Sequence, residues 1–195
     1  MVAMVAMTVN GETVLPIRRA RPDDAAALSA LAIRTFEDTF GPYTAPEDMT
    51  AYMSEAYTAD RQRAEILDSK NTIFVVEAVA SGAEPVLMAY AYVSRSTPPA
   101  CVTGVDPIEL KRLYVDKPWH GQGVAHRLMD ESIAAAKALG GQTMWLSVWE
   151  RNFRAQAFYR RYGFERVGEH IFAVGKDPQV DWLMARSLAP AKPAY

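Results

Sequence analysis

Residues 115–129, VDKPWHGQGVAHRLM, contain the feature on which the interpretation of the whole chain depends. Gly121 and Gly123 flank Gln122, and an apolar pattern of helical period begins directly after them. Glycine lets the backbone turn tightly and approach a ligand without a Cβ in the way. A helix start offers unpaired N–H groups and the positive end of the helix dipole, so anions bind there. The stretch therefore fits either an ordinary turn or a backbone site for phosphate, and the rest of the chain must decide.

The composition is that of an ordinary soluble domain. Half of the 195 residues are hydrophobic and 23% are charged, which is typical of globular proteins. We expect one domain at 13–195 after a loose N-terminal tail at 1–12. The net charge of −2 gives no basic surface for nucleic acid. No apolar run approaches the ~18 residues of a membrane span. The single cysteine suits a reducing compartment, so we expect a cytoplasmic protein with no membrane or nucleic-acid partner.

Hydrophobic periodicity and turn residues divide the chain into strands and helices. Leu28, Ala32, Phe36 and Phe40 recur every four residues and predict one buried helix face. A nearly continuous apolar run at 143–149 is typical of a buried central strand. The predicted strands cover 14–20, 71–80, 85–95, 108–115, 143–149, 165–174 and 179–187. The predicted helices cover 21–40, 46–57, 60–69, 121–139 and 152–162.

Two common phosphate-binding motifs do not fit the glycine stretch. The dinucleotide motif G-x-G-x-x-G needs glycine where His126 stands, and the Walker loop needs G-K-[ST], which is absent. The segment His120 to Ala125 resembles the acetyl-CoA signature of the GNAT N-acetyltransferases. That signature is Arg or Gln, two residues, Gly, one residue, then Gly or Ala. Gly123 and Ala125 match it, whereas His120 stands where the family has Arg or Gln.

A second block of matches supports the same resemblance. The family continues with a strand Leu-x-Val, an Asn four residues later, then Ala, Phe-Tyr and Gly-Phe. The matching residues here are Leu146, Val148, Asn152, Ala155, Phe158, Tyr159, Gly163 and Phe164. The resemblance covers roughly residues 14–187. It implies an α+β GNAT fold: a mixed, mostly antiparallel seven-stranded sheet with helices on both faces and splayed central strands.

The resemblance also implies a site for acetyl-CoA. Backbone amides at 121–126 would bind the pyrophosphate, and the strand edge at 113–115 would pair with the pantetheine arm. The implied cofactor-binding residues are Leu113, Tyr114, Val115, His120, Gly121, Gln122, Gly123, Val124, Ala125, His126, Asn152 and Tyr159. Neutral imidazole lacks the permanent charge of arginine, so the role of His120 stays open. No histidine has metal-ligand spacing to another His, Cys or acid, and no metal is expected.

Two residues are the candidate catalytic groups. Tyr159 matches the family's general acid for the departing thiolate, and the alternative is a surface aromatic of an amphipathic helix. Asn152 lies two turns earlier on the same face, where it would also suit an N-cap. Glu109 matches the glutamate that many members place on the strand before the glycine turn. It would act as the base for the amine, or it is a solvated carboxylate at the strand edge.

The acceptor is predicted to be a small primary amine. The segments 35–57 and 172–188 look similar to bacterial polyamine N-acetyltransferases. Acidic residues in the first segment could attract a polycation, although a solvated helix face explains them equally well; these are Glu37, Asp38, Glu47, Asp48 and Glu55. The alternatives are an enzyme that acetylates proteins or peptides and a catalytically silent acyl-CoA-binding module. The expected assembly is a monomer or a homodimer.

Overall fold

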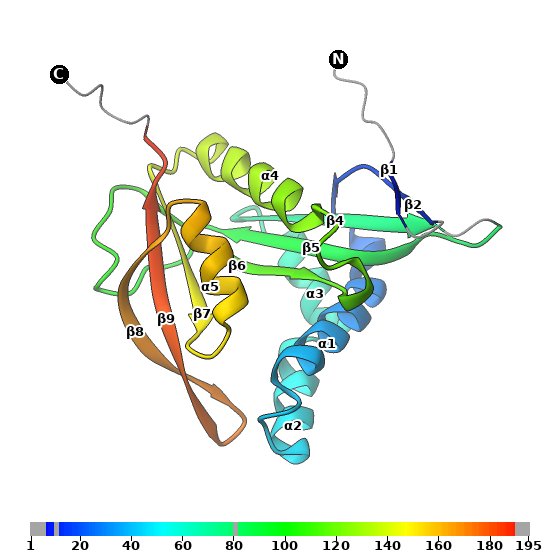
Figure 1. Ribbon diagram of the computed structural model, residues 1–195, viewed down its shortest axis with the longest axis horizontal. Helices are drawn as coiled ribbons and strands as arrows, with labels where there is room; N and C mark the ends of the chain where they lie inside the picture. Colours follow the sequence, from blue (N-terminus) through cyan, green and yellow to red (C-terminus); the bar gives the residue numbers. More distant parts are fainter. Residues whose placement is uncertain (1–6, 10–11, 80–81, 190–195) are drawn as a thin grey trace.

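The computed structural model describes residues 7–9, 12–79 and 82–189 (Figure 1). The strands are β1 (Met7–Val9), β2 (Glu12–Val14), β3 (Arg18–Arg19), β4 (Asn71–Val79), β5 (Val86–Ser94), β6 (Pro107–Val115), β7 (Thr143–Trp149), β8 (Glu165–Val174) and β9 (Asp177–Ser187). The α-helices are α1 (Ala25–Phe40), α2 (Pro46–Ala56), α3 (Ala59–Leu67), α4 (Val124–Ala138) and α5 (Phe153–Arg161). Short 3-10 turns lie at Pro22–Asp24 and Lys117–Trp119.

One sheet runs through the described residues in the order β1-β2-β4-β5-β6-β7-β9-β8, with β3 also on β4. Every neighbouring pair is antiparallel except β6 and β7, which are parallel. The predicted mixed, mostly antiparallel sheet is therefore confirmed. The sheet has nine strands rather than the seven predicted.

The two additional strands come from the N-terminal segment. The predicted strand 14–20 is divided around Pro16, which has no N–H for a ladder, so β2 and β3 pair with β4 separately. The predicted loose tail is wrong in part, because Met7–Val9 pairs with Glu12–Val14 as an antiparallel ribbon. The rest of that tail, residues 1–6 and 10–11, lies outside the described residues.

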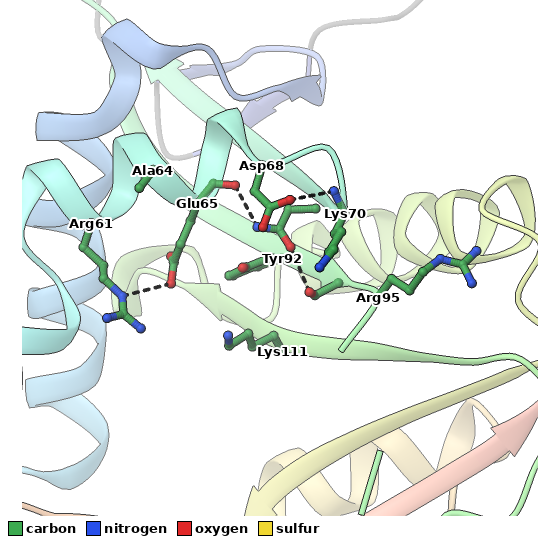
Figure 2. A pocket seen from close by; sticks show the side chains of 10 residues that line it. Arg61, Ala64, Glu65, Asp68, Lys70, Tyr92, Arg95 and Lys111 are labelled. Carbon is green, nitrogen blue, oxygen red and sulfur yellow. Dashed lines mark hydrogen bonds and ion pairs between the residues drawn. The ribbon is translucent and has the colours of Figure 1, made fainter. Parts of the chain in front are cut away.

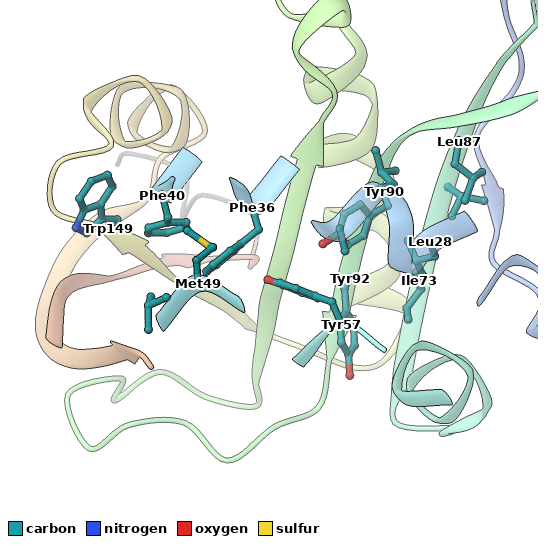
Figure 3. Packing of buried hydrophobic residues seen from close by; sticks show 14 residues of the cluster. Leu28, Phe36, Phe40, Met49, Tyr57, Ile73, Leu87, Tyr90, Tyr92 and Trp149 are labelled. Atoms are coloured by element: carbon teal, nitrogen blue, oxygen red, sulfur yellow. The ribbon is translucent and has the colours of Figure 1, made fainter. Parts of the chain in front are cut away.

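Helices cover both faces of the sheet, as predicted. Leu28, Ala32, Phe36 and Phe40 of α1 are all buried, together with residues of β4, β5 and Trp149 (Figure 3). On the other face, residues of α4 and α5 pack against β6, β7 and β9. Burial of these two apolar layers against the sheet is the main force that holds the helices in place.

The sheet divides between β6 and β7. These parallel strands pair only at Pro107–Thr143, Ile108–Met144 and Glu109–Trp145. Beyond those pairs β6 continues along β5, whereas β7 continues along β9, and the two halves diverge (Figure 1). The register between β5 and β6 shifts at Tyr92/Val93, a bulge that bends β6 at the start of the divergence. The splayed central strands are therefore present, and they create a gap in the middle of the sheet.

Candidate active site

The glycine turn presents a run of backbone donors at the gap. Among the described residues, none of the N–H groups from Gly121 to Ala125 donates a hydrogen bond within the protein. His126 differs, because its N–H donates to the carbonyl of Gly123 at 3.1 Å. Successive unpaired N–H groups at a helix start form a concave site for anions. We call these five amides the cradle, and they form a site to which an anion could bind.

Glycine is required at two positions of the cradle. Gly121 and Gly123 both have φ of +78°, in the left-handed region that other residues rarely adopt. Gly123 is the N-cap of α4 in this conformation, so the helix begins at Val124 rather than at the predicted residue 121. A Cβ built on either glycine meets no atom within 4 Å. The space above the cradle is therefore open to a ligand.

His120 connects the cradle to two other elements. Its Nε2 lies 2.8 Å from the carbonyl oxygen of Val115, and its Nδ1 lies 2.8 Å from a guanidinium nitrogen of Arg154. Since the carbonyl can only accept and the guanidinium can only donate, Nε2 carries the proton and Nδ1 accepts. Both ring nitrogens are thus occupied in the neutral ring. His120 holds the exposed Arg154 of α5 beside the cradle.

The edge of β6 turns part of its backbone toward the gap. Asp116 lies opposite Met88 of β5, and its N–H donates to the Met88 carbonyl at 2.8 Å, so these two residues form a hydrogen-bonded pair. The next pair along the strands, Val115 and Ala89, is therefore a non-hydrogen-bonded pair. Because the two kinds of pair alternate, Leu113 and Val115 direct their N–H and C=O groups away from β5. Tyr114, which the resemblance placed at the same edge, directs its backbone groups to Tyr90 of β5 instead.

Helix α5 contributes Asn152 and Tyr159. The side-chain oxygen of Asn152 accepts a hydrogen bond from Ala155 N at 3.0 Å, so the N-cap role is present. Its amide nitrogen has no partner among the described residues and is available to a ligand. Tyr159 is buried, which excludes the alternative of a surface aromatic. Burial raises the pKa of the Tyr159 hydroxyl well above its usual range, so this group keeps its proton at neutral pH.

Glu109 lies at the apex of the gap. It is the last residue of β6 that pairs with β7, opposite Trp145, and it is half-buried. Its neighbours Ile108 and Leu110 are both buried in the cluster that contains residues of α4, and successive side chains of a strand point to opposite faces. Glu109 is therefore on the face of the sheet opposite α4.

The sequence-predicted residues thus come together from β6, the glycine turn and α5 around one gap. Tyr114 packs against the cluster on the α1 face of the sheet, whereas Tyr159 belongs to the cluster on the α4 face. Arg154 belongs to the same group but was not anticipated from the sequence. Its position two residues after Asn152 was the available signal, since both lie in the first turn of α5.

A separate cavity of about 440 Å³ lies beside α3, and none of the predicted site residues lines it (Figure 2). Its wall includes Glu65, whose carboxylate binds Arg112 of β6 at 2.6 Å. Both side chains of this pair are about nine-tenths buried, at 9% and 10% exposure. The pair attaches α3 to the bulged region of β6, so we assign this wall a structural role.

The acidic residues of the first segments do not form one site. Glu37, Asp38, Glu47 and Glu55 are exposed on the surfaces of α1 and α2. Glu47 and Glu55 are eight residues apart on one helix, which corresponds to about 12 Å. Asp48 accepts a hydrogen bond from Lys176 N at 2.8 Å and attaches α2 to the β8–β9 turn. The solvated-face interpretation explains four of these residues, and a structural contact explains Asp48.

Within the described ranges, no helix is long and apolar enough to cross a bilayer. Across the same part of the chain, no three His, Cys, Asp or Glu side chains are grouped as metal ligands would be.

A sheet that divides between two parallel strands, with an anion-binding cradle at the division, defines a protein that holds a phosphate-bearing ligand in the gap. The chain belongs to the acetyltransferase (GNAT) family, whose family model matches residues 32–164. It is 31% identical over 166 residues to an uncharacterised N-acetyltransferase of Mycobacterium tuberculosis. The alignment covers 85% of this chain and 98% of that relative. The protein is thus an N-acetyltransferase.

Solved structures of acetyltransferases share the fold, and two of them contain the cofactor. One is the PaiA N-acetyltransferase from Thermoplasma acidophilum in complex with coenzyme A, with a TM-score of 0.67, 19% identity and coverage of 89% of this chain and 98% of that chain. The other is YncA, a putative acetyltransferase from Salmonella typhimurium with its cofactor acetyl-CoA, with a TM-score of 0.64, 19% identity and coverage of 95% and 99%.

Proposed function

We propose that the protein transfers the acetyl group of acetyl-CoA to a primary amine of a small molecule, by direct attack while both substrates are bound. The observation that carries the cofactor assignment is the cradle of five unpaired amides at the open end of the divided sheet. A pyrophosphate carries two negative charges and several acceptor oxygens, which suits such donors without any basic side chain. When bound, acetyl-CoA supplies an activated carbonyl and a thiolate leaving group.

Each side of the gap has a separate role in this proposal. The unpaired amide nitrogen of Asn152 and the N–H groups of Leu113 and Val115 bind polar groups along the arm of the cofactor. An N–H of this edge that points at the carbonyl oxygen also stabilises the negative charge that develops there. Arg154, held by His120, supplies the permanent positive charge that His120 itself lacks.

The proton transfers are assigned to two residues. The amine must lose a proton to attack, and Glu109 at the apex accepts it directly or through water. Tyr159 holds a proton on its buried hydroxyl and delivers it to the leaving sulfur. Glu109 belongs to β6 and Tyr159 to α5, and Glu109 points away from the cluster of Ile108, Leu110 and Tyr159. This separation suits a base for the acceptor and an acid for the thiolate.

Turnover of acetyl-CoA with a panel of amines tests the proposal. The panel contains polyamines, amino acids, aminoglycosides and a peptide with a free N-terminus, and thiol release is measured. We expect a small amine to give the highest kcat/KM. Preference for the peptide would replace the small-molecule acceptor by a protein one. Binding of CoA without turnover of any amine would favour the silent module. A polyamine, the cytoplasmic location and the monomeric or dimeric state stay predictions.

A further inference from the structure

Asp181 is a buried carboxylate that is only half satisfied. It lies in the interior of β9 with 7% of its surface exposed. Its Oδ2 accepts a hydrogen bond from the Ser147 hydroxyl at 2.6 Å. Its Oδ1 is inaccessible to bulk solvent and has no hydrogen-bond partner among the described residues. Buried polar atoms of this kind are rare, because each one loses its hydration without replacement.

No described cation is hydrogen-bonded to this carboxylate. Ser147 donates its proton to Asp181, so its oxygen accepts from His170 Nε2 at 2.8 Å. His170 Nε2 itself lies 4.0 Å from the carboxylate oxygen, beyond hydrogen-bond distance. The network therefore orients Oδ2 and leaves Oδ1 with an open acceptor position.

The sheet register places Oδ1 of Asp181 on the face of the sheet that carries α1. Asp181 lies directly between Trp149 of β7 and His170 of β8 in the sheet register. Trp149 packs with α1 on the face opposite α4, and its indole N–H is also buried without a partner. An unpaired acceptor and an unpaired donor thus occupy neighbouring positions on one face, as expected where a polar ligand binds.

Aromatic rings connect this position to the reaction centre. Tyr52 of α2 stacks on Phe36 and meets Phe172 of β8 edge-on, with centroids 4.8 and 5.6 Å apart. Burial is the main cause that raises the pKa of Tyr52, and the charge of Asp181 adds a smaller contribution in the same direction. Tyr52, Tyr114 and Phe172 all pack against the cluster that contains Phe36 and Trp149. Asp181 therefore lies beside Trp149 on the face of the sheet that carries this aromatic cluster, opposite the face that holds Tyr159.

We propose that Oδ1 of Asp181 binds an ammonium group of the acceptor, with Ser147 and His170 as positioning residues. This inference rests on the proposed function and adds the acceptor's chemistry: a primary amine that arrives positively charged and lies among aromatic rings. An ammonium group satisfies the open carboxylate oxygen with a charged hydrogen bond. Aromatic faces such as those of Tyr52 and Trp149 attract the same charge.

Paired ligands provide the test. We would titrate 2-phenylethylamine, spermidine and an alanine-initiated peptide into the protein, with and without CoA, and 2-phenylethanol as the uncharged analogue. In the parent protein the phenylethylamine should bind about 10- to 100-fold more tightly than the alcohol, the range expected for one charged hydrogen bond. Asp181→Asn should remove most of that difference. The affinity for CoA should not change, because the cradle is on another element.

Glu169→Gln is the matched control, since it removes an equal charge from an exposed position of β8. It should leave the ratio of amine affinity to alcohol affinity as in the parent.

An Asp181→Asn variant that keeps the ratio would overturn the proposal, as would a parent protein that binds none of the charged probes. Either result with normal CoA affinity would leave the cofactor assignment intact. Loss of CoA binding in the parent would instead contradict the proposed function. Comparison of the two small amines with the peptide identifies the source of the ammonium group.

Discussion

At the scale of single residues, His120 departs from the family motif, and its side chain is hydrogen-bonded to a residue of another element. The imidazole has one carbonyl and one guanidinium as partners, so neither nitrogen is available for phosphate. In the proposed function, His120 orients Arg154, and Arg154 supplies the positive charge. No feature of the residues 115–129 could indicate this, because Arg154 is 34 positions away along the chain.

A double-mutant cycle tests this dependence. His120→Ala and Arg154→Ala should each weaken CoA binding about 5- to 30-fold, or ~1–2 kcal/mol, because both remove the same held charge. The double variant should be no weaker than either single one. Calorimetric titration measures all four affinities, with Arg160→Ala on the same helix as the control. Additive losses would show that the two residues act separately.

Tyr159 permits a similarly direct test. Tyr159→Phe keeps the ring in its buried position but removes the proton. We expect kcat to fall by ~10²–10⁴-fold, the usual contribution of a positioned acid, with little change in acetyl-CoA affinity. Steady-state kinetics and a CoA titration separate these effects. Turnover equal to that of the parent would make Tyr159 a packing residue and assign the proton to water or another group.

At the scale of elements, the cradle combines a conformation that only glycine adopts easily with the start of a helix. The sequence predicted this helix but placed its first residue at 121. The apolar pattern shows which residues are buried, but it does not show that Gly121 and Gly123 adopt a positive φ and so lie outside the helix. The structure moves the start to Val124, and the three intervening residues become donors instead of a helical turn. The C-terminal end of the same helix was predicted better, since Gly140 has φ of +80° directly after it.

The two ends of α4 provide a matched pair for mutation. Gly123→Ala and Gly140→Ala each place a side chain in the left-handed region with no atom within 4 Å of the new Cβ. Both should lose about 1–2 kcal/mol of stability, because the strain is the same. Only Gly123→Ala should also weaken CoA binding, by tenfold or more, since its Cβ enters the open space above the cradle. Equal CoA affinity in the two variants would contradict the cradle.

At the scale of the whole molecule, the order of elements could be predicted from the sequence, but the neighbours in the sheet could not. Periodicity identified β7, β8 and β9 individually. Their adjacency as β7-β9-β8 is a long-range result, and it alone brings Ser147, His170 and Asp181 together. The alternation of Val180, Trp182 and Met184 was visible in the sequence. It puts Asp181 on the other face of its strand, but nothing in the sequence indicates what that face binds.

The buried carboxylate should also affect the stability of the whole protein. Burial raises the pKa of Asp181 above 3.8, against smaller opposing effects of Ser147 and His170. The folded state therefore binds a proton more tightly than the unfolded state. Stability from this group should fall as the pH rises from 3.8 through the raised pKa. Asp181→Asn removes this dependence, so its stability relative to the parent should increase over that interval.

Urea unfolding of both proteins at a series of pH values measures this difference. A difference that does not change with pH would contradict the burial of an ionised group. An increase in stability together with weaker amine binding would show that the protein keeps this carboxylate for binding, at a cost to folding.

The unpaired amides of Gly121–Ala125 have a further consequence, for isotope exchange with the solvent. A backbone proton without an acceptor is replaced by deuterium without any opening of the structure, whereas the protons inside α4 must wait for local unfolding. The cradle of the free protein should therefore take up deuterium within the shortest labelling time. Phosphate oxygens would capture these same protons, so the segment that exchanges fastest without acetyl-CoA should show one of the largest decreases when it is added. Deuterium uptake by this loop thus reports whether the site is occupied, and it needs neither turnover nor a known acceptor.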